Sequence, residues 1–149
     1  MVPPCGGWRV AWIRAEGRPP RGTSTFSGSA NSYADPALLD EVFRDFPGLT
    51  VVLAHGGRGW WYDQAAFLAL MRPNVWVEVS GLPPQRLPDY FGPSLRRLAD
   101  KMVFGTDWPG VPGVRRNALA VGHVLAAAGA TPDQVALALG GNARRVFGL

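Results

Sequence analysis

The sequence predicts an α/β fold with a parallel sheet. Runs of β-branched and apolar residues at 49–54, 75–80 and 102–105 alternate with segments of helical periodicity. No two-residue hairpin turn joins one run to the next, and a repeated strand–helix order is typical of parallel strands with right-handed crossovers. Two architectures fit this order: an open doubly wound sheet, or part of a (β/α)8 barrel. A complete barrel takes about 250 residues, so a chain of 149 residues would form about half of one.

The run 49–54 is the clearest strand. Its residues are apolar or β-branched on both faces, as expected for a strand buried in a parallel sheet. It ends at His55, after which Gly56 and Gly57 allow a sharp turn. Ligands and catalytic groups collect at the carboxyl ends of parallel strands. We therefore expect the rest of the chain to be organised around this edge.

Caps and helix breakers mark the other elements. Asp35 and Pro36 suit an N-cap and a first helical position, and apolar residues at helical spacing follow until Pro47 and Gly48. We expect further helices at 62–71, 85–90, 93–100 and 114–128, one that starts at Pro132 after the N-cap Thr131, and a short one from Asn142.

The start of the chain gives weaker signals. Prolines and glycines surround one short apolar patch, Trp8 to Ile13, which is compatible with a single strand. Residues 22–34 are small and polar, which is typical of a loop. We therefore expect residues 1–21 to form an atypical segment and residues 22–149 to form the folded domain.

Composition and charge exclude several function classes. With 47% hydrophobic and 17% charged residues, the chain is expected to be globular. Its net charge of +4 is scattered, and no groove-reading motif is present, which argues against nucleic-acid binding. The single Cys5 excludes an internal disulfide and fits a reducing cytoplasm. There is no apolar run of about 18 residues and no signal-peptide core, so we expect neither membrane insertion nor secretion.

Two polar residues stand at the carboxyl ends of different predicted strands. His55 follows the run 49–54, and Asp107 follows the run 102–105. An imidazole and a carboxylate at one mouth suit a divalent metal and a metal-activated water. Taken alone, Asp107 could be a turn or cap residue, and His55 could be a turn histidine bonded to backbone. Their equivalent positions favour a functional site.

Other candidates are more ambiguous. Glu78 lies within a predicted strand, where a buried carboxylate needs a partner or a metal, and we favour a structural role such as an ion pair with an arginine. Arg58 and Trp60 follow the glycines after His55 and could line a substrate mouth, or they could be a surface arginine and a helix-starting aromatic anchor. His123 lies in a predicted helix, away from any strand end, and is expected to be a surface or packing residue.

Four segments resemble the amidohydrolase-related (amidohydrolase 2-like), metal-dependent TIM-barrel hydrolases, a family that includes the aminocarboxymuconate semialdehyde decarboxylase-like enzymes. These segments are Leu53–Gly57, Trp76–Pro84, Phe104–Pro109 and Gly141–Phe147. The resemblance extends over residues 22–149 and concerns the carboxyl-terminal half of the family. It implies a partial (β/α)8 barrel, from strand five or six to strand eight, in which His55 ends strand six and Asp107 ends strand eight.

The resemblance also implies a chemistry. Asp107 would be a metal ligand and a general acid or base, and His55 would ligate the metal or polarise the attacking water. The cofactor would be a divalent metal, zinc in the first place, and the substrate a small cyclic or carboxylated molecule. Hydrolysis is the first expectation, and decarboxylation is an alternative within the same superfamily.

Some family ligands have no counterpart in this sequence. The His-x-His or Glu-x-His pair of the first strand is absent, and Pro20 and Arg21 precede Gly22-Thr23-Ser24 where the fifth strand of the family has His and Thr. We therefore also expect a truncated barrel, either inactive or completed by a second copy or by another chain. The first 21 residues would then be unrelated to the family, as in a frame-shifted reading.

Overall fold

The computed structural model describes residues 10–13 (backbone only), 35–57, 60–107 and 113–149. Its centre is a four-stranded sheet in the order β1-β2-β3-β4, with every neighbouring pair parallel. The strands are β1 (Val10–Ile13), β2 (Thr50–Leu53), β3 (Val75–Glu78) and β4 (Met102–Val103). The predicted parallel α/β fold is thus confirmed, and the patch before residue 14 supplies β1. The loop predicted at 22–34 lies outside the described residues.

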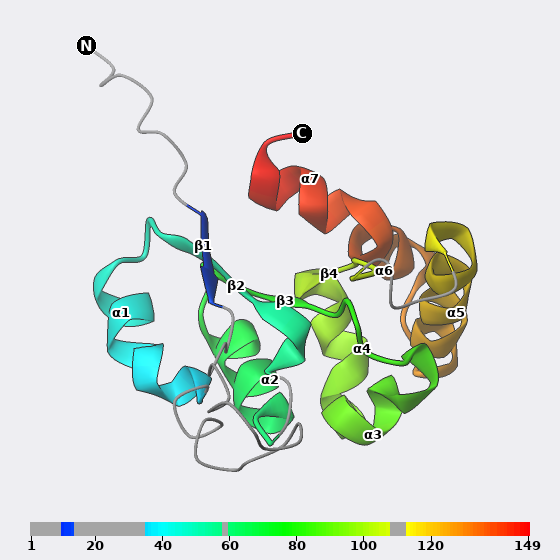
Figure 1. Ribbon diagram of the computed structural model, residues 1–149, viewed down its shortest axis with the longest axis horizontal. Helices are drawn as coiled ribbons and strands as arrows, with labels where there is room; N and C mark the ends of the chain where they lie inside the picture. The colour runs from blue at the N-terminus through cyan, green and yellow to red at the C-terminus, as the bar shows by residue number, and fades with distance from the viewer. Residues whose placement is uncertain (1–9, 14–34, 58–59, 108–112) are drawn as a thin grey trace, which may run out of the picture.

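The strand order decides between the two architectures. Each strand is added next to the previous one, in register pairs such as Val51 with Val75 and Val77 with Met102. A doubly wound sheet reverses its strand order at a switch point, and this sheet does not. The helices α1 to α4 lie on one side of the sheet, while the last helix, α7, lies on the other side beside β4 (Figure 1). The consecutive strand order, with α1 to α4 on one face, is that of a partial (β/α)8 barrel, and α7 covers the face that would point to the interior of a complete barrel.

The helix that follows Asp35 starts as a 3₁₀ helix. The Asp35 side chain accepts a hydrogen bond from the Ala37 amide at 2.9 Å, as expected for an N-cap. The 3₁₀ helix η2 (Pro36–Leu39) then passes into α1 (Asp40–Asp45). After β2 and the 3₁₀ turn η3 (Ala54–Gly56), α2 spans Tyr62–Met71, the range that the sequence predicts.

The segment between β3 and β4 is a chain of short helices. These are η4 (Pro84–Arg86), α3 (Leu87–Phe91), η5 (Gly92–Ser94), α4 (Leu95–Leu98) and η6 (Ala99–Lys101). Pro84 at the first position of η4 and Pro88 at the second position of α3, together with Gly92 at φ 48°, divide what the sequence predicts as two helices.

The carboxyl-terminal helices form one nearly continuous run. After α5 (Val114–Ala127), α6 (Pro132–Ala136) starts with a capping box between Thr131 and Gln134, and the π-helical turn η7 (Leu137–Gly141) links it to α7 (Asn142–Phe147). The sequence correctly predicts that α7 begins with Asn142. This residue is fully buried, and its Nδ2 donates to the carbonyls of Ala99 at 3.0 Å and Met102 at 2.8 Å.

The sheet has two unlike faces. Its outer face, with Val51, Leu53 and Val77, packs against the helices in a large apolar core. On its inner face, Val52 and Val103 form a small buried cluster with Val146 of α7. In the part of the chain that the structure describes, none of the helices has the length and apolar character needed to cross a bilayer.

Candidate functional site

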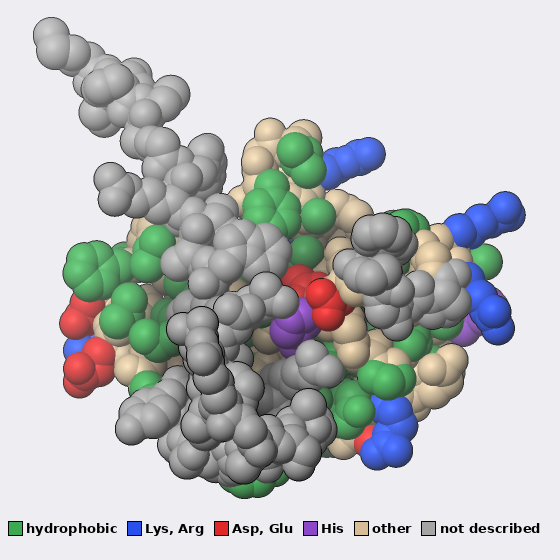
Figure 2. Space-filling model, in the orientation of Figure 1, with side chains coloured by type: hydrophobic (Ala, Val, Ile, Leu, Met, Phe, Trp, Pro, Cys, Tyr) green, Lys and Arg blue, Asp and Glu red, His purple; other side chains and the backbone are tan. Residues whose placement is uncertain are grey.

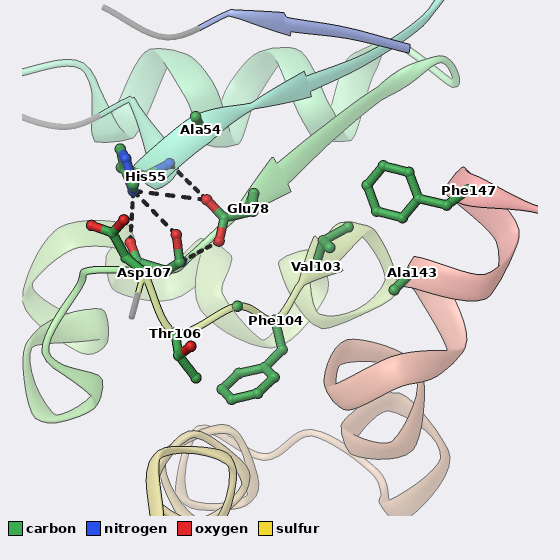
Figure 3. A pocket seen from close by; sticks show the side chains of 11 residues that line it. Ala54, His55, Glu78, Val103, Phe104, Thr106, Asp107, Ala143 and Phe147 are labelled. Atoms are coloured by element: carbon green, nitrogen blue, oxygen red, sulfur yellow. Dashed lines mark hydrogen bonds and ion pairs between the residues drawn. The ribbon is translucent and has the colours of Figure 1, made fainter. Parts of the chain in front are cut away.

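A cavity of about 480 Å³ lies at the carboxyl end of the sheet. Its polar lining comes from the ends of three strands, as Figure 3 shows, and its apolar lining comes partly from α7. The polar residues are His55, Glu78, Ser80, Thr106 and Asp107, and the others are Ala54, Val103, Phe104, Gly105, Ala143 and Phe147. In Figure 2, the histidine near the centre of the view lies beside acidic side chains. The structure therefore brings His55 and Asp107 into one cavity.

Both residues have an unusual backbone conformation. His55 has φ 54° and Asp107 has φ 52°, and among the described residues no other non-glycine residue has a positive φ. For an L-residue this left-handed region is strained, and such strain persists only where the surrounding structure enforces it. The turn after His55 is tightly packed: a Cβ on the next residue, Gly56, would lie 2.7 Å from Cζ of Phe91. The turn is therefore packed directly against α3.

The hydrogen bonds of the His55 ring fix its tautomer. Nδ1 lies 2.9 Å from the carbonyl oxygen of Ser80 and 3.3 Å from the Ser80 hydroxyl. A carbonyl can only accept a hydrogen bond, so the hydrogen of the neutral ring must be on Nδ1. Nε2 then keeps a free lone pair, which is the state required of a general base or of a metal ligand. The backbone-bonded histidine and the functional histidine, two alternatives from the sequence, are thus compatible.

Glu78 belongs to the same site. Its side chain is buried, with 4% of the residue exposed. Oε1 accepts from the Ser80 amide at 2.5 Å, and Oε2 accepts from the His55 amide at 3.2 Å and lies 3.8 Å from Nδ1. The partner that the sequence suggested, an arginine, is replaced by His55 and two backbone amides. The sequence places Glu78 inside a strand that runs to Ser80, whereas β3 ends at Glu78, so its position at a strand end could not be recognised from the sequence.

Two glycines leave room for the carboxylates of Glu78 and Asp107 beside His55. A Cβ on Gly81, which has φ 66°, would lie 2.9 Å from Oδ2 of Asp107 and 3.5 Å from Nδ1 of His55. A Cβ on Gly105 would lie 2.6 Å from Oε1 of Glu78. Both positions therefore need glycine for the side chains of His55, Glu78 and Asp107 to share this cavity.

The expected substrate-binding pair receives no support here. Trp60 is 67% exposed and is not among the residues that line the cavity. Arg58 lies outside the described residues, as do Trp108 and Pro109 after Asp107. A substrate contact by Arg58 or Trp60 therefore stays a prediction. His123 lies exposed on α5, as the sequence suggested.

The described residues do not fit a metal ion by themselves. A catalytic zinc site takes three protein ligands, and the described ranges contain no group of three His, Cys, Asp or Glu side chains that could hold a metal. His55 and Asp107 offer two donors, while both oxygens of Glu78 already accept hydrogen bonds from backbone amides. Any metal site in this cavity needs a further ligand from outside the described part of the chain.

Comparisons with known proteins agree with this architecture. In the solved structures, the chain resembles an uncharacterized TIM-barrel protein from Bordetella bronchiseptica, with a TM-score of 0.57 and 31% sequence identity. The match covers 81% of this chain and 43% of that protein, so the chain spans less than half of its relative's length. A comparison with curated proteins gives no match.

The family comparison is more extensive. The family model described as Amidohydrolase matches residues 21–149, which include the whole cavity lining and every strand except β1. The resemblance drawn from the four sequence segments is thereby confirmed. The chain belongs to the amidohydrolase family.

Proposed function

We propose that this chain supplies the proton-transfer part of a hydrolytic site of the amidohydrolase type. The observation that supports this most directly is the state of His55, whose Nδ1 is bonded to a carbonyl and whose Nε2 is therefore a free base in a cavity shared with Asp107. In hydrolysis, Nε2 removes a proton from the attacking water, which is general-base catalysis. Asp107 orients that water by accepting a hydrogen bond and favours the imidazolium that forms.

The cavity suits a small substrate with an apolar or cyclic part. Val103, Ala143 and Phe147 form the apolar side of the cavity, across from the polar residues at the strand ends (Figure 3). No lysine or arginine is among the described lining residues, whereas Glu78 and Asp107 are. This charge pattern disfavours a substrate carboxylate, so we place hydrolysis before decarboxylation as the reaction.

A metal-dependent form of this reaction needs further ligands. The family resemblance implies a divalent metal, with zinc in the first place, for which Asp107 is the carboxylate donor of this chain. Because the described residues supply too few donors, we propose that the remaining ligands come from the rest of a barrel, in a second copy or in another chain. The oligomeric state of the purified chain, measured by sedimentation, tests the first of these two sources.

The main test combines turnover with a matched histidine control. The full chain is assayed with Zn²⁺ or Mn²⁺ against a panel of small lactones and cyclic amides, together with His55→Ala, Asp107→Ala and His123→Ala. We expect kcat/KM to fall about 10²- to 10⁴-fold in His55→Ala, as for the loss of a general base, and to be unchanged in His123→Ala. Equal activity of His55→Ala and the unmodified chain would exclude this mechanism.

Metal stoichiometry tests the ligand argument separately. Calorimetric titration with Zn²⁺ is expected to show weak binding to the isolated monomer, because two donors hold zinc poorly. If a dimer forms, binding should be tight and should be lost in both Asp107→Ala and His55→Ala. Weak binding together with absence of turnover would favour the alternative expectation, an inactive barrel fragment.

A further inference from the structure

The buried carboxylate of Glu78 links the ends of two neighbouring strands. Its Oε2 accepts from the backbone amide of His55, directly after β2, and its Oε1 accepts from the backbone amide of Ser80, directly after β3. We propose that Glu78 is a positioning residue, which sets both the backbone conformation and the ring tautomer of His55. This inference rests on the proposed role of His55 as the base.

The first link acts on the backbone of His55. Residue 55 has left the sheet, with φ 54° and ψ 28°, so its amide no longer points along the ladder of hydrogen bonds between strands. A buried amide without a partner is costly. Glu78 supplies that partner at 3.2 Å, and a hydrogen bond to a carboxylate is stronger than one to a neutral acceptor. The strained turn that presents the imidazole is thereby favoured over a relaxed one.

The second link acts on the ring of His55 through Ser80. Glu78 holds the Ser80 amide at 2.5 Å. The carbonyl of the same residue accepts from Nδ1 of His55 at 2.9 Å. One carboxylate therefore fixes the main chain on both sides of the imidazole. Because the carbonyl cannot donate, this arrangement selects the Nδ1–H tautomer and leaves Nε2 as the base.

The packing around Glu78 supports the same role. Gly105, after β4, has no side chain, and a Cβ there would lie 2.6 Å from Oε1 of Glu78 and 3.0 Å from Cβ of Ser80. The absence of a side chain on Gly105, just after β4, thus leaves room for the Glu78 carboxylate. With 4% of the residue exposed and both oxygens engaged by amides, Glu78 is better suited to hold other groups than to bind a substrate or a metal.

The experiment is ¹⁵N NMR of the histidine rings in the full chain. The sequence has only two histidines, and exposed His123 serves as an internal reference for an unrestrained ring. Spectra are recorded on the high-pH plateau, where the ¹⁵N shifts of both rings no longer change with pH. We expect His55 to carry its hydrogen on Nδ1, whereas a free imidazole prefers Nε2–H. An Nε2–H tautomer for His55 in the unmodified chain would overturn the proposal without the use of any variant.

Two variants then remove the link in different ways. Glu78→Gln keeps the side-chain shape but replaces one accepting oxygen by a donating NH₂. Gly105→Ala keeps the carboxylate but places a Cβ where Oε1 lies. Both should raise the Nε2–H population of His55 several-fold, with the His123 signals unchanged. Ser80→Ala is the matched control, since it removes only the hydroxyl at 3.3 Å and leaves the carbonyl and amide in place.

Turnover supplies a second readout that is independent of the spectra. If the proposed function holds, Glu78→Gln should lower kcat about 10- to 100-fold with little change in KM, since the base is misplaced and the substrate wall is not. An unaltered His55 tautomer in the folded Glu78→Gln protein would contradict the positioning role even if activity fell. Conversely, a chain without any turnover whose tautomer shifts as expected would refute the proposed function and leave the positioning role intact. Should Glu78→Gln fail to fold, Gly105→Ala gives the same decision.

Discussion

The two faces of the sheet are packed very differently. On the outer face, Val51 and Val77 belong to a large buried core that extends into the helices α1 to α5. On the inner face, the buried cluster consists only of Val52, Val103 and Val146. The outer face is thus completed by the chain's own helices. The inner face borders the cavity, and among the described residues the helix packed against it is α7, near the end of the chain (Figure 1).

The backbone follows the same division. The outer residues of β2 and β3 have regular parallel pairing, while the residues that enter the cavity, His55 and Asp107, are held in the left-handed region. Burial of apolar side chains raises the free energy of unfolding, whereas strained backbone conformations lower it. The difference indicates that the helical layer supplies most of the folding free energy, and it supports the proposed role of the strand ends as a functional site.

The largest expected effect is the loss of a large side chain from the outer core. Leu98 of α4 is fully buried there. Leu98→Ala should lower the free energy of unfolding by about 2–5 kcal/mol, from lost burial and from the cavity that remains. Urea denaturation measures this change, and Leu119→Ala on the exposed surface of α5 (57% exposed) is the control, with an effect within about 0.5 kcal/mol. Similar values for the two variants would contradict the assignment of stability to this layer.

Loss of the hydrogen bonds made by Asn142 should have the next largest effect on the free energy of unfolding. Asn142 joins α7 to the sheet, since its Nδ2 donates to the carbonyls of Ala99 and Met102. Asn142→Ala removes both hydrogen bonds in a fully buried place and should cost about 1–3 kcal/mol. Asn142→Asp keeps the shape but turns an oxygen toward two carbonyls, so it should be at least as destabilising. A loss below about 0.5 kcal/mol in urea denaturation would show that α7 is held by apolar contacts alone.

A pair of adjacent valines compares the faces directly. Val51 and Val52 are both almost fully buried, with 1% and 0% exposed, and point to opposite faces of β2. Val51→Ala should cost about 1 kcal/mol more than Val52→Ala, because the small inner cluster can relax toward the cavity and the outer core cannot. Equal losses in thermal or urea unfolding would mean that the two faces are packed equally well.

The sequence predicts the outer layer well because its signals are local. Helix α2 follows the predicted range, and Thr131 caps α6, because caps, prolines and periodicity act over a few neighbouring residues. His55 and Asp107 could also be predicted, since each follows an apolar strand. The parallel order of the strands then places them in one cavity.

The features that the sequence did not predict depend on contacts between distant parts of the chain. The pairing of Glu78 with the His55 amide spans 23 positions, and the bond from Asn142 to the Met102 carbonyl spans 40. Neither can be derived from local periodicity, because both depend on which backbone groups are left unpaired at strand ends. For the same reason Glu78 appeared in the sequence as the partner of an arginine.

The smallest expected effect concerns Lys101, the only lysine of the chain. Its Nζ lies 4.4 Å from the ring centroid of Trp76, next to the inner cluster, and donates to the carbonyl of Pro73 at 2.6 Å. Burial of the ammonium group lowers the pKa of Lys101 from its ordinary value of 10.5 to about 8. The folded chain therefore releases this proton at a lower pH than the unfolded chain does.

The sign of the pH dependence follows from this difference in proton binding. Between pH 8 and 10.5 the unfolded state holds more protons, so the contribution of Lys101 to stability should rise with pH across this window. Comparison of urea unfolding with Lys101→Met at several pH values isolates it, and we expect a change of about 1 kcal/mol or less after solvent screening. NMR of the single lysine side chain gives the pKa directly. A value at or above 10.5 would show that the cation–π contact and the Pro73 carbonyl outweigh burial, and that the inner face stabilises a charge as the apolar outer core does not.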